Sequence, residues 1–108
     1  MQSYSLPSYS YDDLTLGASG TPYTAPADGW VTFIWYGEIT NNVYLTSRKA
    51  DGTLLLVANQ SYTNAGNHAM FIPVIKNQIF IINYDNMSFR PDLGNFLRFI
   101  YAHGSQQS

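Results

Sequence analysis

Apolar and polar residues alternate with a period of two along much of the chain, which is the pattern of β-strands. The pattern is strongest in residues 23–37, YTAPADGWVTFIWYG, which predict a short strand, a tight turn and one long strand. The turn is placed at residues 25–29, where Pro26 restricts φ, Asp28 can bond its own backbone and Gly29 accepts a positive φ. We expect the rest of the chain to be organised around this long strand.

The long strand is apolar on both of its faces. One face carries Val31, Phe33 and Trp35, and the other carries Trp30, Thr32, Ile34 and Tyr36. The segments predicted as strands at residues 67–75 and 96–102 have the same character. Because one face of a small antiparallel sheet normally meets water, we expect another copy of the chain to cover the second face.

The remaining pattern predicts about eight short strands and no helix. They span residues 9–16, 23–25, 29–37, 43–48, 53–58, 67–75, 78–84 and 96–102, with polar loops at 38–42, 59–66 and 85–94. This spacing favours an all-β, antiparallel fold of two sheets, a sandwich or jelly roll. A single domain is expected at residues 9–103, with a flexible lead-in or linker stub at 1–8 and a flexible tail at 104–108.

The composition argues against nucleic-acid binding, membrane insertion and cysteine chemistry. Charged residues are 11% of the 108, against about 25% in an average soluble chain, while aromatic residues reach 16%. With only 5 Lys plus Arg and a net charge of −2, the chain lacks the basic surface of a nucleic-acid binder. No segment approaches about 18 consecutive apolar residues, so no membrane insertion is expected. Without cysteine, disulfides and thiol nucleophiles are excluded.

Three motifs occur in an order that resembles a known superfamily. They are YTAPADG followed by WVTFIWYG, then AGNHA followed by MFIPVIKNQIFIINY, and finally GNFLRFIYA. Together they resemble the trimeric jelly-roll proteins that include the globular head of the first complement component and tumour necrosis factor. The resemblance covers residues 9–103 and implies a homotrimeric knob with one sheet facing the threefold axis. It places the following residues at the trimer interface: Val31, Phe33, Ile34, Trp35, Phe71, Phe99 and Tyr101.

The opening of the domain is also similar to the C-terminal tip domains of bacteriophage tail or head fibres. This resemblance lies in YTAPADGW, preceded by a DLTL strand and a GASG turn. It implies a virion protein whose knob adheres to a host cell; outside a virion, it implies a cell-surface or extracellular location. No collagen-like repeat or heptad pattern precedes the knob, so tail and head fibre both stay open.

Aromatic and amide side chains in the predicted loops suggest a ligand site. Aromatic rings stack on the C–H face of a sugar, and planar amides pair with its hydroxyls. If the last strand runs toward the base, loops 37–42, 59–66 and 85–95 emerge together at the distal end, and three copies would gain avidity. The alternative is that the rings fold inward and the amides serve turns. The candidate ligand-binding residues are Asn41, Asn42, Tyr62, Asn64, Tyr84, Asn86, Phe89 and Arg90.

The sequence contains fewer residues that suggest metal binding or catalysis than residues that suggest ligand binding. Asp85 and Asp92 flank the longest loop and would be the ligands if calcium binds, as the resemblance to calcium-holding heads allows; turn capping is the alternative. No other cofactor is expected. His68 and His103 are the only imidazoles, and neither lies in a nucleophile motif.

Three functions follow from these observations. The first is a non-enzymatic adhesion knob that recognises a host-cell surface glycan or protein through its distal loops. The second is a structural capsid or fibre module for trimerisation or decoration, with no ligand. The third, a hydrolase of surface polysaccharide, is disfavoured because the 7 acidic residues show no convincing pair.

Overall fold

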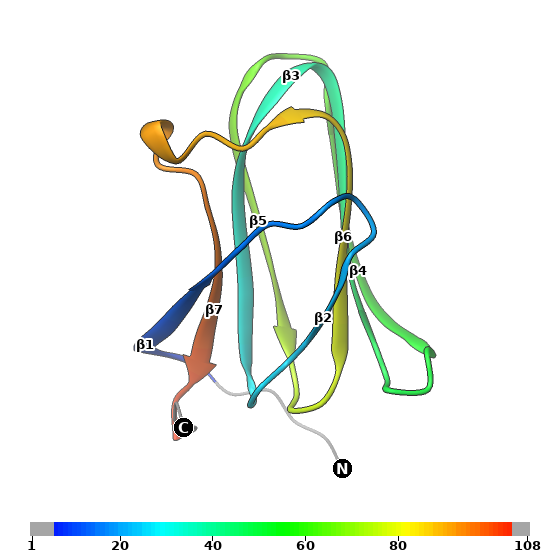
Figure 1. Ribbon diagram of the computed structural model, residues 1–108, viewed down its shortest axis with the longest axis vertical. Helices are drawn as coiled ribbons and strands as arrows, with labels where there is room; N and C mark the ends of the chain where they lie inside the picture. Colours follow the sequence, from blue (N-terminus) through cyan, green and yellow to red (C-terminus); the bar gives the residue numbers. More distant parts are fainter. Residues whose placement is uncertain (1–5, 105–108) are drawn as a thin grey trace.

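The computed structural model describes residues 6–104, which form one curled antiparallel sheet (Figure 1). The predicted all-β class is confirmed, with no α-helix in this part of the chain. The strands are β1 (Pro7–Leu14), β2 (Pro22–Thr24), β3 (Gly29–Arg48), β4 (Leu54–Tyr62), β5 (Gly66–Val74), β6 (Ile79–Ser88) and β7 (Phe96–Ala102), with a 3-10 turn, η1 (Pro91–Leu93), before β7.

Strand β3 organises the sheet, because it pairs with four other strands. Its first half, residues 29–37, pairs with β5 and β7, and its second half pairs with β4 and β6. Strand β6 also reaches back to Tyr36 and Gly37, which links the two halves. The loop predicted at 38–42 is therefore a bend within one strand, where Thr40 adopts a φ of 59°.

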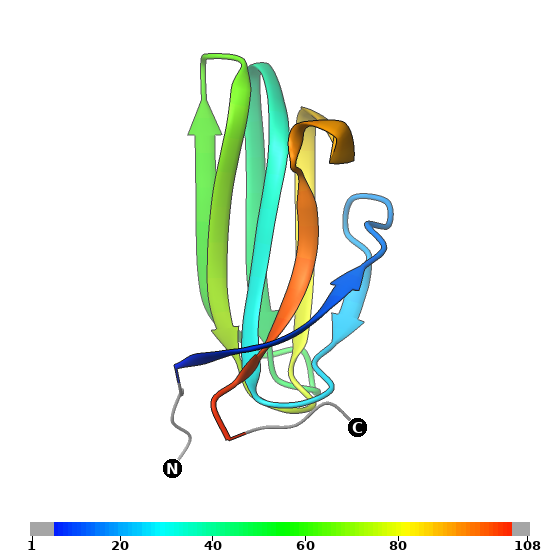
Figure 2. The same cartoon turned by 90° about the vertical axis from the view of Figure 1, so that its left-hand side faces the viewer.

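The outer strands complete the curl. The hydrogen-bonded order is β1-β7-β3-β6-β2, and β4 and β5 each pair with β3 away from this path. Figure 2 shows β1 crossing β3 and β7 obliquely as the sheet curls. Strand β1 begins at Pro7, so the predicted lead-in at 1–8 overlaps it, while residues 1–5 and 105–108 lie outside the described part.

Two predicted loops are shorter in the structure than in the sequence analysis. Strand β4 continues to Tyr62 and β6 continues to Ser88, although both ends are polar. The side chains of Asn59 and Ser61 are exposed while those of Gln60 and Tyr62 are partly buried, so the period of two persists. A polar strand end is stable here because its backbone pairs with β3 and one face meets water.

The core is built from one face of each long strand. Its largest fully buried side chains are Trp35, Phe33, Phe80 and Phe99, and the rings of Phe33 and Trp35 stack at 5.3 Å. Five residues predicted at a trimer interface lie inside this core and leave no surface for another chain, so their assignment is corrected: Val31, Phe33, Trp35, Phe99 and Tyr101. Period-two alternation turns them inward, while Ile34 and Phe71 face outward.

Gly29 allows β3 to start close against β7. A Cβ atom at this position would lie 2.6 Å from Cζ of Phe99 and would also meet the carbonyl oxygen of Ile100. The positive φ expected at Gly29 is wrong, since this residue is not among the glycines with a left-handed backbone. Space, rather than backbone conformation, requires glycine here.

A hydrogen bond between a phenol and a carboxylate joins β1 to β7. The phenol of Tyr101 donates a hydrogen bond of 2.6 Å to the carboxylate of Asp12, and Tyr101 is buried. This hydrogen bond, followed by burial and the charge of Asp12, raises the pKa of Tyr101 to about 12 from 10.0. The folded state therefore holds the phenol proton more tightly than the unfolded state does.

We expect the free energy of unfolding to fall as the pH rises from about 10 to about 12. The contribution of Tyr101 is fully present below the unfolded pKa and is lost as the pH passes through the folded pKa. Denaturant titrations across this range should show a shallower slope for Tyr101→Phe than for wild type. Tyr9→Phe is the control, because Tyr9 is fully exposed. Equal slopes for Tyr101→Phe and wild type would contradict the assignment.

Candidate functional site

Three connecting segments meet at the end of the molecule opposite the end of β7. They are the bend of β3 at residues 38–41, the turn at 63–65 between β4 and β5, and the segment from the end of β6 to η1 (Figure 1). The predicted gathering of these loops at one distal end is thus confirmed for the described residues. Most of the predicted ligand-binding residues belong to this end.

Asn41 holds two of the distal turns together. Its side-chain amide donates hydrogen bonds to the carbonyl oxygens of Glu38 at 2.7 Å and Asn64 at 3.4 Å, and its Oδ1 accepts from Nε1 of Trp35 at 3.4 Å. The residue is only 1% exposed. A Cβ at Gly37 would lie 2.6 Å from Oδ1 of Asn41, so glycine leaves room for this amide. Asn41 is therefore a structural residue, and its predicted ligand role is corrected.

Tyr62 stacks on an imidazole. The rings of Tyr62 and His68 are parallel within 3°, with centroids 3.6 Å apart, and the Tyr62 hydroxyl donates to Oε1 of Gln60 at 2.7 Å. The ring of His68 also lies 5.8 Å from the ring of Trp35, and Nε2 of His68 lies 3.4 Å from the carbonyl oxygen of Asn64. One face of Tyr62 is therefore covered by the protein itself.

The amides of β3 and β6 near the bend also have partners within the chain. Asn42 accepts a hydrogen bond from the Ser61 hydroxyl at 2.8 Å, and Asn86 donates one to the carbonyl oxygen of Thr40 at 3.1 Å. Asn86 adopts a φ of 56°, a left-handed conformation that asparagine tolerates better than most residues. The bond of Asn86 fixes the bend of β3, and the bond of Asn42 links β3 to β4. The sequence analysis left open the alternative that such amides serve the fold, and these bonds support it.

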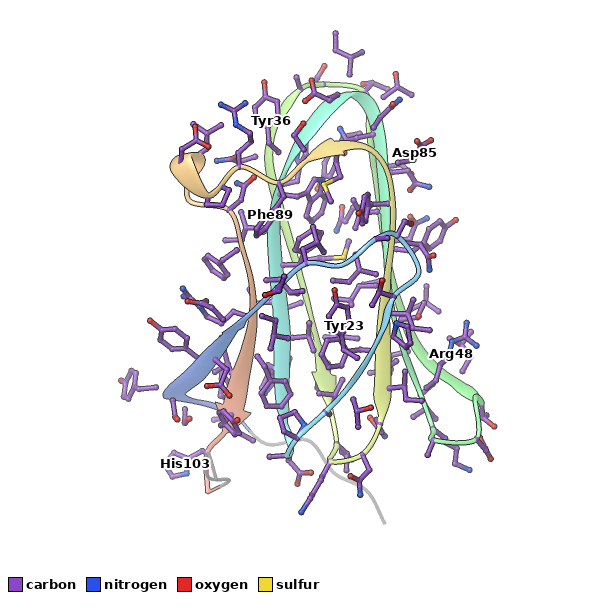
Figure 3. The ribbon with its side chains drawn as sticks, viewed as in Figure 1. Tyr23, Tyr36, Arg48, Asp85, Phe89 and His103 are labelled. Atoms are coloured by element: carbon purple, nitrogen blue, oxygen red, sulfur yellow. The ribbon has the colours of Figure 1, made fainter. Side chains whose placement is uncertain are left out.

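Two of the predicted aromatic residues point toward the protein. The hydroxyl of Tyr84 donates to the carbonyl oxygen of Gly17 at 3.0 Å. The ring of Phe89 packs against the core and stacks on Phe33 at 6.2 Å, and Figure 3 places its side chain between β3 and the segment leading to β7. Phe89 therefore closes the distal end of the core.

Arg90 and Asp92 form an ion pair beside η1. The guanidinium contacts both carboxylate oxygens, at 3.2 and 3.1 Å, and lies 5.9 Å from the ring centroid of Tyr36. Hydrogen bonds from Arg90 hold the pKa of the Asp92 carboxyl below its usual range. The pair is exposed and remains accessible to a partner.

The structure does not bring Asp85 and Asp92 together. Asp85 lies on the side of β6 that pairs with Asn42, and Figure 3 shows it across the molecule from η1, where Asp92 ion-pairs with Arg90. In residues 6–104, no group of three His, Cys, Asp or Glu side chains gathers. The predicted calcium ligands are therefore not a preformed pair.

A second candidate surface is the outward face of the first half of β3 with β5 and β7. Trp30 and Phe71 lie 5.6 Å apart there, and Phe71 is 63% exposed. A shallow cavity of about 300 Å³ beside them is lined by Leu6, Pro7, Trp30, Thr32, Phe71 and Ile100. We call this surface the open apolar face. Of the predicted interface residues, Ile34 and Phe71 belong to the open apolar face. The period-two alternation along β3 and β7 could also have identified Trp30 and Ile100 as members of this face.

Arg98 lies at the β1 margin of the open apolar face, in an arrangement that sequence analysis missed. Its guanidinium is stacked between the rings of Tyr11 and Phe96, at 4.0 and 3.9 Å, and bonds Oδ1 of Asp13 at 2.7 Å. Stacking of this kind fixes a side chain that would otherwise be flexible. No sequence signal could have found it, because the β1–β7 register brings Asp13 opposite Arg98.

No family model matches the chain, and no curated protein or solved structure matches it. No helix within residues 6–104 is long and apolar enough to cross a membrane. The resemblance to trimeric jelly-roll knobs and phage fibre tips stays a prediction.

Replacing Asn41 by Ala should destabilise the fold by about 1–3 kcal/mol, since the buried Trp35 indole and two turn carbonyls lose their partner. The amides of residues 38–40 and 63–65 should exchange faster with solvent than in wild type. Asn42→Ala is the matched control, because the hydrogen bond between the Asn42 side chain and the Ser61 hydroxyl is exposed. If both variants unfold at the same denaturant concentration as wild type, Asn41 does not hold the turns.

Proposed function

We propose that this chain is a non-enzymatic recognition knob that assembles as a homotrimer and binds a cell-surface glycan or protein through its distal end. The finer fold is part of the proposal: a jelly roll whose two layers are β1-β7-β3-β5 and β2-β6-β3-β4, with β3 shared between them. The division of β3 pairing into two halves supports these layers.

The observation that carries the proposal is the open apolar face. Large exposed apolar patches on soluble chains commonly mark interaction sites, and this one combines Trp30, Ile34, Phe71 and Ile100 on one side of the sheet. Packing this face around a shared axis removes it from water. The number of copies, three, comes from the resemblance to trimeric knobs.

The distal turns supply the recognition surface. Their exposed side chains include the Arg90–Asp92 pair, the turn residue Asn64 and Ile39, which is 71% exposed. Three copies would present three sets of these turns at one end, so weak contacts with a repeated surface glycan would add up. A virion location, at a tail or head fibre tip, rests on the resemblance alone.

The structural alternative has specific support. Asn41, Asn42, Asn86 and Tyr84 all form hydrogen bonds within the chain, so fewer candidate side chains are available to a ligand than the sequence suggested. A capsid or fibre trimerisation module without a ligand would also use the open apolar face. Both functions predict self-association, and only a binding assay separates them.

We expect light scattering of dilute wild-type protein to give about 36 kDa, three times the 12.1 kDa chain. Phe71→Glu should reduce the mass to that of one chain, because a carboxylate would be buried in an apolar contact. Tyr44→Glu is the control, since Tyr44 is exposed on the second half of β3. A single chain for wild type, or an unchanged mass for Phe71→Glu, would refute the assembly.

The combined substitution Asn64→Ala and Arg90→Ala should weaken binding to an array of immobilised bacterial surface polysaccharides by about tenfold or more, with the mass unchanged. The substitutions leave the core intact, whereas truncating Phe89 would open it. Lys76→Ala, in the turn before β6 at the opposite end, should bind like wild type. If wild type binds no spot on the array, or the double variant binds as tightly, the structural module is favoured.

A further inference from the structure

Strand β4 is a free edge of the sheet. It pairs with β3 through an uninterrupted register from Asn41–Tyr62 to Ser47–Leu56, and no other strand in residues 6–104 pairs with it. Figures 1 and 2 both show β4 at a margin of the molecule. A free edge presents a row of backbone N–H and C=O groups that can pair with another strand.

The other edges of the sheet carry features that discourage such pairing. Strand β1 contains Pro7, Asp12 and Asp13, and its register shifts between Pro7 and Tyr11. Strand β2 is 3 residues long and begins with Pro22. Strand β5 contains Pro73, which has no N–H to donate. Charges, prolines, irregular register and short length are the usual protections of edge strands.

Strand β4 has none of these protections along its regular part. Its sequence, LLLVANQSY, contains no charged residue, proline or glycine over 9 residues. The one irregularity in its register lies at its start, beside Arg48. Val57 is 54% exposed and Leu54 is 48% exposed, so apolar side chains also face water along this edge. An unprotected edge of this length is typical of a strand that is covered in the assembled protein.

We propose that β4 pairs with β4 of a second copy of this chain, as antiparallel strands related by a twofold axis. Because β4 carries no charge, two copies can align without like-charge repulsion. The contact uses the same edge on both copies, so it closes at two. It is small, since one strand is added to one strand, and therefore depends on protein concentration. It uses a different surface from the open apolar face and does not depend on the proposed trimer.

The test is made with Phe71→Glu protein, so that association through the open apolar face is removed. Sedimentation from micromolar to millimolar concentration should show this variant rising from 12.1 kDa toward about 24 kDa, two chains. Adding Val57→Lys, a charge at an exposed position on the free edge, should hold the mass at one chain. Adding Tyr44→Lys instead should leave the rise in mass unchanged, because Tyr44 lies on β3 between β4 and β6 and not on the free edge.

Three results would overturn the proposal: no rise in mass, an equal rise with Val57→Lys, or growth beyond two copies, which would indicate open-ended aggregation. If Phe71→Glu does not fold, the pairing of β4 can be tested by amide hydrogen exchange of the wild-type protein at low and high concentration. The β4 amides that point away from β3 should then exchange more slowly at high concentration, while those of β1 do not change. Concentration-independent exchange in β4 would exclude the pairing.

Discussion

The structure depends on the backbone pairing of β3 with four other strands. A strand has two edges, and a bent strand of 20 residues can pair on both edges along each half. The first half pairs with β5 and β7, and the second half with β4 and β6. Every strand except β1 and β2 therefore pairs directly with β3, and these two are attached through β7 and β6.

The alternation of side chains along β3 determines where the core lies and which surface stays open. Trp35 and Phe33 point inward and fill the curl of the sheet, while Trp30 and Ile34 point outward. A chain with few charged residues has few salt bridges with which to cover such a face, and the Arg98–Asp13 pair lies at its β1 margin. The fold thus leaves an apolar surface partly exposed to solvent.

The distal end shows how side chains that resemble a ligand site can serve the fold instead. Asn41 and Asn86 satisfy carbonyl groups of turns, because a sharp bend in a strand leaves backbone groups without ladder partners. Phe89 covers the end of the core. The side chains that remain accessible at this end include Arg90 with Asp92 and Ile39.

The sequence by itself determined the all-β class, the approximate positions of most strands and the presence of a second apolar face, because these follow from local alternation and turn chemistry. It did not show that the segments at 29–37 and 43–48 form one bent strand. It could not decide which apolar residues fill the core, since Val31 and Ile34 have similar hydrophobicity and differ only in the face that the curled sheet encloses. The pairing register placed Arg98 beside Asp13, and the tertiary structure brought the turn at Asn64 to the amide of Asn41. Contacts between residues far apart in the chain are decided by tertiary structure, because register and curl have no local signal.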